Sequence, residues 1–131
     1  MNEAIRQIHN TAMDLSQLAR MKKHTLDGKV YSDYLKAAYE LDLYALSKMD
    51  EPKSDNERLW KAMIIQSAGW LAFKCGYIEQ AKRLAKTGLA IPTDGYVLSR
   101  LESLVAKANS ELKKDDFSKD NASFSIYGFL S

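Results

Sequence analysis

The stretch that most constrains the fold of this chain is Trp60–Phe73, which reads WKAMIIQSAGWLAF. Only Lys61, Gln66 and Ser67 in this stretch are plainly polar. A helix that is apolar on nearly all sides is usually covered by neighbouring elements on several sides. We therefore expect Trp60–Phe73 to lie in the central helix of an all-α domain.

The rest of the chain also favours helices over strands. It contains six glycines and two prolines in 131 residues, whereas an all-β domain needs frequent turns. A chain of this length normally forms one domain. We predict about five helices packed as antiparallel hairpins over residues 1–112, followed by a tail over 113–131. The predicted helices span residues 3–25, 30–49, 55–74, 78–89 and 94–112.

Two local patterns support these boundaries. Ser54-Asp55-Asn56-Glu57 has the form of a capping box, in which Ser54 accepts the N–H of Glu57 and Glu57 accepts the N–H of Ser54. Apolar residues recur at spacings of three and four on one face of the 30–49 helix. Charged residues of that helix, including Asp42, are expected to face solvent.

The helices 30–49 and 78–89 share a pattern 43 residues apart, which indicates two hairpins of one design. Within the second hairpin, residues 65–92 resemble a tetratricopeptide repeat. That motif has small residues where its two helices cross and a glycine at the turn, and the matching positions here are Gly69, Gly76, Ala81 and Gly88. Gly69 is expected to mark the crossing with the 78–89 helix, where Gly88 provides the matching gap.

The chain departs from the motif at Ile65 and Ala72, where the motif has aromatic residues, and Pro92 comes one residue early. As a whole it is similar to short bacterial tetratricopeptide-like proteins with two hairpins and a final helix. This resemblance implies a right-handed array of stacked hairpins and a non-enzymatic protein-binding role. Such an array forms a groove, and we expect the helices 30–49, 78–89 and 94–112 to line it.

Two groups of side chains are candidates for binding a protein or peptide partner. Exposed tyrosines suit a protein-binding face. The 30–49 helix carries four tyrosines, and not all of them can point inward. Of these, Tyr31, Tyr34 and Tyr39 are the candidates for contacting a partner. The polar face of the 78–89 helix carries Lys82, Arg83 and Lys86.

The tail has an apolar load that is unusual for a chain end, since solvated tails are normally polar. Its apolar residues are Phe124, Ile126, Tyr127, Phe129 and Leu130. The partial alternation of these residues permits an extended piece, but one strand cannot satisfy its own backbone. We therefore expect the tail to dock on the helices of its own chain or on a second subunit, which would form a homodimer.

The sequence shows no catalytic, cofactor or metal signature. No phosphate-binding glycine motif is present, and His9 and His24 are too far apart to ligate one metal from a single helix. Arg20 and His24 enclose three residues, fewer than the four to six in the arginine–histidine motif of small helical ribonucleases. The lone Cys75 is expected to be a small apolar packing residue. We expect no enzyme and no cofactor.

Two alternative functions remain open. The first is a nucleic-acid-binding or ribonuclease-like bundle that uses Arg20, Lys22, Lys23 and His24, or Lys82, Arg83 and Lys86, although a net charge of +2 argues against it. The second is a small-molecule or lipid site beside Trp70 and Phe73, which would require a cavity.

The start of the chain, MNEAIRQIHN, lacks the apolar segment of a signal peptide. No run of about 18 apolar residues is present either. We therefore expect a cytoplasmic protein without a membrane partner.

Overall fold

The computed structural model describes residues 2–23 and 27–130, with side chains described as far as Lys114. Five helices make up most of the described residues, which contain no strand. The predicted all-α fold class is confirmed. The helices are α1 (Glu3–Met21), α2 (Gly28–Ser47), α3 (Asp55–Lys74), α4 (Ile78–Leu89) and α5 (Gly95–Leu130).

Side-chain caps explain where α1, α2 and α3 begin. Asn2 and Asp27 each accept a backbone N–H two residues later, at 2.7 and 3.0 Å. At α3 the predicted capping box is confirmed in one half, because Ser54 Oγ accepts the Glu57 N–H at 3.1 Å. In its other half the prediction is wrong by one residue, since Glu57 Oε2 accepts the N–H of Lys53 at 2.7 Å.

The turn between α3 and α4 is built around Gly76, whose φ of 85° lies in the left-handed region that favours glycine. The Gly76 N–H donates to Phe73 O at 3.0 Å, and the Tyr77 N–H donates to Ala72 O at 2.8 Å. These two bonds form a Schellman motif, which satisfies carbonyls left open at a helix end. Gly76 is thus the turn glycine that the repeat pattern predicts.

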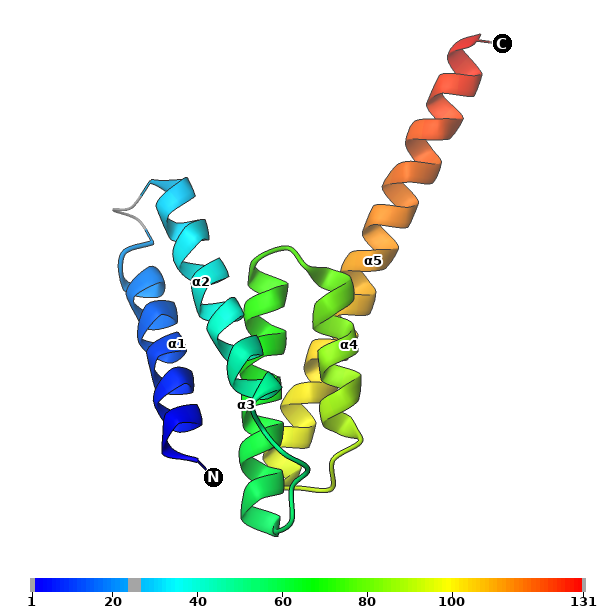
Figure 1. The fold of residues 1–131 in the computed structure, drawn as a ribbon. Coiled ribbons are helices and arrows are strands. Elements are labelled where there is room, and N and C mark those ends of the chain that lie inside the picture. The colour runs from blue at the N-terminus through cyan, green and yellow to red at the C-terminus, as the bar shows by residue number, and fades with distance from the viewer. Residues whose placement is uncertain (1, 24–26, 131) are drawn as a thin grey trace.

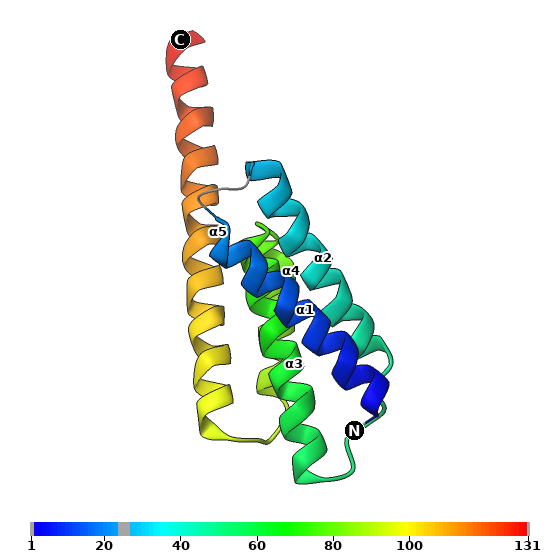
Figure 2. The same ribbon diagram turned by 90° about the vertical axis from the view of Figure 1, so that its left-hand side faces the viewer.

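The helices pack as an array of hairpins. Each helix packs against the next one in the chain, and α3 also packs against α5. Figure 1 shows α1–α2 and α3–α4 as antiparallel pairs with α5 beside α4, and Figure 2 shows that α1, α3 and α5 run in the same direction. As predicted, α3 is the central helix, and it contributes seven buried residues from Ala62 to Ala72.

Glycines let α5 approach both helices of the second hairpin. A Cβ at Gly69 would lie 2.6 Å from Leu104 Cδ2 and 3.8 Å from the Ala81 carbonyl oxygen. A Cβ at Gly88 would lie 2.8 Å from Leu101 Cδ1 and 3.0 Å from Ile65 Cγ2. Both glycines thus lie where α3 and α4 meet, as predicted, with Gly69 near Ala81 and Gly88 near Ile65, and each one also accommodates a leucine of α5. Ala81 is fully buried at the crossing of α3 and α4.

The helix α5 does not end near Leu112 as predicted, because its backbone continues as a helix to Leu130. The last turns extend past the ends of α3 and α4 in both views (Figures 1 and 2). The apolar tail residues Phe124, Ile126, Tyr127, Phe129 and Leu130 lie outside the described side chains. Their docking on the same chain or on a second subunit stays a prediction.

Candidate functional site

A cleft of about 260 Å³ opens between three helices, α1, α3 and α5. Of the helices predicted to line the groove of the array, α2, α4 and α5, only α5 contributes to the cleft. The hairpins stack so that their first helices, α1 and α3, lie on the same side as α5. The cleft is lined by Met13, Ser16, Gln66, Ser67, Trp70, Leu71, Lys74 and Arg100.

The spacing of these residues shows how the sequence builds the cleft. Residues three and four apart share one face of a helix. On α1 this face carries Met13, Ser16 and Arg20, and Lys23 follows in the turn after α1. On α3 the face carries Gln66, Ser67, Trp70 and Lys74, and on α5 it carries Arg100, Ser103 and Lys107. We call these three stripes the groove face. They contain five basic residues and no acidic residue.

The five basic residues of the groove face, which we call the groove cations, are Arg20, Lys23, Lys74, Arg100 and Lys107. None of them forms an ion pair with a carboxylate among the described side chains. Partial burial lowers the pKa of the Lys74 ammonium, and the positive charges of Arg20, Arg100 and Lys23 lower it further. Three helices thus bring charges of one sign close enough to repel each other.

On the α5 side of the cleft, the Trp70 ring contacts two of the groove cations. The Arg100 guanidinium carbon lies 5.6 Å from the centroid of the Trp70 ring, and Lys107 Nζ lies 5.2 Å from it. These distances fall within the range of cation–π attraction. Phe73 packs against the same ring edge-on, with the centroids 6.0 Å apart. The Trp70 Nε1–H is buried and has no hydrogen-bond acceptor in the described part of the chain.

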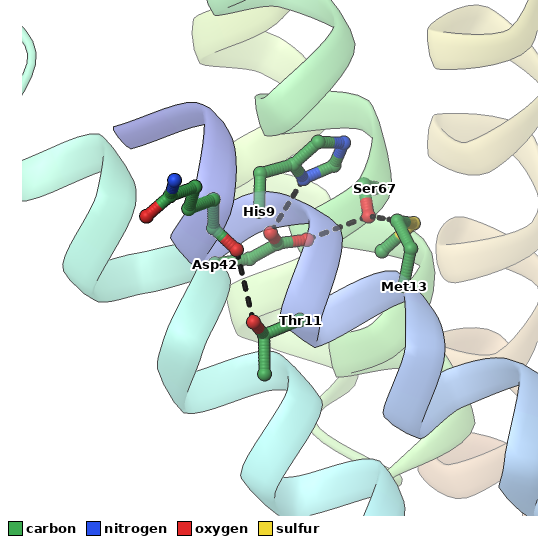
Figure 3. Close-up of polar contacts among 6 residues, drawn as sticks. His9, Thr11, Met13, Asp42 and Ser67 are labelled. Carbon is green, nitrogen blue, oxygen red and sulfur yellow. Dashed lines mark hydrogen bonds and ion pairs between the residues drawn. The ribbon is translucent and has the colours of Figure 1, made fainter. Parts of the chain in front are cut away.

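A buried polar network lies beneath the cleft and joins α1, α2 and α3 (Figure 3). His9 Nδ1 lies 2.8 Å from Asp42 Oδ1, and the Ser67 hydroxyl donates to Asp42 Oδ2 at 2.6 Å. Asp42 is fully buried and His9 is 8% exposed. The expectation that Asp42 faces solvent is therefore wrong, because its carboxylate accepts hydrogen bonds from two neighbouring helices.

This network does not have the order of a nucleophilic triad. Ser67 contacts Asp42 and also lies 3.4 Å from Met13 Sδ, but it makes no hydrogen bond to His9 (Figure 3). A serine nucleophile needs a base within hydrogen-bond reach. The geometry is that of a structural network, and Ser67 is the member that it shares with the lining of the cleft.

The predicted partner-binding tyrosines have different environments. Tyr39 is a core residue, 8% exposed, and its ring centroid lies 5.6 Å from that of Tyr77. Burial raises the pKa of Tyr39, and the nearby Arg83 charge opposes part of this shift. Tyr39 is therefore not on a surface that a partner can contact, whereas Tyr31 and Tyr34 are half-buried against the core.

The predicted basic residues of α4 lie outside the cleft. Arg83 and Lys86 are exposed, and Lys82 is half-buried. Lys82 lines a separate depression of about 440 Å³ with residues of α5, including Asn109 and Lys113. The structure therefore places these cations apart from the groove cations, on another surface of the array.

The remaining candidates have structural surroundings. Cys75 packs against the core, as expected, and burial raises the pKa of its thiol, with the nearby Lys36 charge opposing the shift. Trp60 lies under the Arg6 guanidinium at 5.4 Å. His24 lies outside the described residues. Within the described part of the chain, no group of three His, Cys, Asp or Glu side chains is placed to hold a metal ion.

Sequence reasoning missed both the groove face and the Asp42 network. A signal for the network was present, because Asp42 lies in register with Leu35, Ala38 and Ala45 on the buried face of α2. His9 likewise lies in register with Ile5, Ala12 and Ala19 on α1. A charged residue within an apolar stripe indicates a buried polar partner on a neighbouring helix.

None of the helices among the described residues is long and apolar enough to cross a membrane. Comparison with known proteins found no family model, no curated protein and no solved structure that matches this chain.

Proposed function

We propose that this chain is a non-enzymatic, tetratricopeptide-like module that binds a protein partner across the groove face of α1, α3 and α5. The observation that carries the proposal is the set of five groove cations around one cleft. Lys74 and Arg100 line the cleft, Arg20 and Lys23 lie near enough to Lys74 for their charges to act on it, and Lys107 lies over the Trp70 ring. None of the five has a carboxylate partner among the described residues. Charges of one sign in a cleft raise the local concentration of oppositely charged partners. A bacterial origin and a cytoplasmic location are further parts of this proposal.

The hairpin architecture supports a binding role. Stacked helical hairpins present extended surfaces that receive peptides or helices. The close approaches at Gly69 and Gly88 and the turn at Gly76 match the small-residue pattern of the resemblance. Because α3 is packed against α2, α4 and α5, the groove face rests on a well-supported central helix.

A site-specific crosslinking experiment tests this proposal. A photoreactive amino acid replaces the exposed Ser103 on the groove face or, as the matched control, the exposed Lys86 on α4. Each variant is irradiated in an extract of the source organism. We expect a discrete crosslinked protein from position 103 that is weakened by Arg100→Glu and absent from position 86.

The proposal is wrong if crosslinks form only from position 86, because the partner surface would then be that of Lys82, Arg83 and Lys86. Absence of crosslinks from both positions would also contradict it.

A further inference from the structure

We infer that the groove face binds an acidic segment of its partner, with carboxylates at the groove cations and neighbouring apolar side chains at Met63 and Tyr96. This inference rests on the proposed function and adds the chemistry of the partner.

The groove face carries more positive charge than the whole chain. The chain has a formal charge of +2 and the five groove cations carry +5, so the rest of the chain carries −3. Fields of this kind orient a charged partner toward one face. An anionic partner is therefore attracted to this face. The rest of the described surface has no net charge, because residues 115–131 carry −2 and the buried Asp42 carries −1 of the remaining −3.

Two exposed apolar side chains continue the groove face toward the N-terminal ends of α3 and α5. Met63 precedes Ser67 by one turn on α3 and is 38% exposed. Tyr96 precedes Arg100 by one turn on α5 and is 70% exposed. The groove face thus has an apolar end and a cationic end. At 1.5 Å per helical residue, the span from Tyr96 to Lys107 is about 16 Å, the length of about five extended residues.

The surroundings of Trp70 favour carboxylates over nucleic acid. Proteins that bind single strands stack bases on free aromatic faces. Here Arg100 and Lys107 lie over the Trp70 ring and Phe73 packs against it edge-on. The Trp70 ring therefore contacts cations, and neither Arg100 nor Lys107 forms an ion pair with a carboxylate in the described part of the chain.

Peptide binding to the full chain tests the inference. The probes are six-residue peptides with two leucines and four glutamates, in both orders, the same peptides with glutamine in place of glutamate, and tetraglutamate. Inorganic phosphate and a thymidine oligonucleotide are the competing anions. Dissociation constants are measured at low salt and at rising salt concentration, with circular dichroism to confirm that each variant is folded.

We expect an acidic peptide to bind in at least one order. The pair Lys74→Gln and Arg100→Gln should weaken binding at least tenfold and reduce its salt dependence. The matched pair Arg83→Gln and Lys86→Gln removes the same charge from exposed positions of α4 and should change binding less than twofold. The pair Met63→Ser and Tyr96→Ser should weaken binding of the leucine-containing peptides but not of tetraglutamate.

Several results would overturn the inference. These are absence of peptide binding at low salt, equal binding of the glutamine peptides, equal effects of the two charge pairs, or tighter groove-dependent binding of the oligonucleotide. If the acidic peptides fail while position 103 still crosslinks to a protein, the proposed function stands and only the acidic partner is refuted. If both experiments fail, the groove face is not a binding site.

Discussion

Replacing Gly69 by alanine tests how closely α5 packs against the α3–α4 hairpin. The added Cβ would lie 2.6 Å from Leu104 Cδ2, whereas two carbon atoms prefer about 3.5–4.0 Å. Leu104 is fully buried, so the missing distance of roughly 1 Å must come from a shift of its side chain in the packed core, from strain or from movement of α5. The structure therefore predicts overpacking at this position.

The magnitude follows from two opposing effects. Alanine has a higher helix propensity than glycine, which would stabilise the middle of α3 by about 1 kcal/mol. Overpacking a buried site costs about 1–3 kcal/mol. We expect Gly69→Ala to lower the free energy of unfolding by up to about 2 kcal/mol, and Gly69→Leu to lower it further.

Urea unfolding followed by circular dichroism measures this change as a shift in the midpoint at constant slope. Gly95→Ala is the control, because a Cβ there meets nothing within 4 Å, and its effect should stay within about 0.5 kcal/mol. Leu104→Val removes the clashing methyl, so Gly69→Ala should be stabilising in that background. If Gly69→Ala alone raises the free energy of unfolding by the full helix-propensity gain of about 1 kcal/mol, the close packing of α5 against Gly69 is wrong.

Three further changes test the account. Asp42→Ala should lower the free energy of unfolding by about 3 kcal/mol, because it leaves two buried polar partners unsatisfied. The control Asp33→Ala, at an exposed position of the same helix, should lower it by less than about 0.5 kcal/mol. Equal unfolding midpoints of the two variants in urea would contradict the buried network. The raised pKa of Cys75 means that the folded thiol keeps a proton that the unfolded thiol loses above about pH 8.5, so stability should fall as pH rises through the folded pKa. Cys75→Ala should show less of this alkaline loss in unfolding experiments from pH 8 to 11, and identical profiles would refute it. Because the charges of Arg20, Arg100 and Lys23 act on Lys74, Lys74→Met should raise the free energy of unfolding at low salt, by no more than about 0.5 kcal/mol for a charge this exposed. The gain should shrink in salt, and a loss of stability at low salt would contradict the repulsion.

Local features of the sequence were sufficient to predict the helices. The bounds of α3 and α4 agree with the structure, because Ser54, Gly76 and Pro92 are strong local signals for helix ends. The end of α5 was wrong, since the charged run 113–116 and the apolar residues after it interrupt the amphipathic pattern without breaking the helix. No proline or glycine lies in that run to stop it.

The groove face combines residues of three helices, and no local sequence pattern predicts how those helices pack against each other. Arg20 and Lys23 were interpreted from sequence as the basic end of a helix, and Trp70 as a core or cavity residue. Only the packing of α3 against α5 shows that Trp70 lies under Arg100 and Lys107. For the same reason the residues predicted from the sequence to bind a partner are tyrosines of α2 and cations of α4, which lie outside the cleft.

The central claim is that the face of α1, α3 and α5 is the binding surface. The Trp70 indole N–H reports on this surface directly, because it is buried at the cleft without an acceptor in the described chain, and the Trp60 indole N–H on the same helix serves as the internal reference. The chain has two tryptophans, so only two indole signals have to be assigned in a nitrogen–proton NMR spectrum of the labelled protein. On titration with the acidic leucine–glutamate peptide, the account predicts a saturable shift of the Trp70 indole signal together with backbone signals of Ser67 and Arg100. A saturable shift confined to α2 and α4, with the Trp70 signal unmoved, would contradict it.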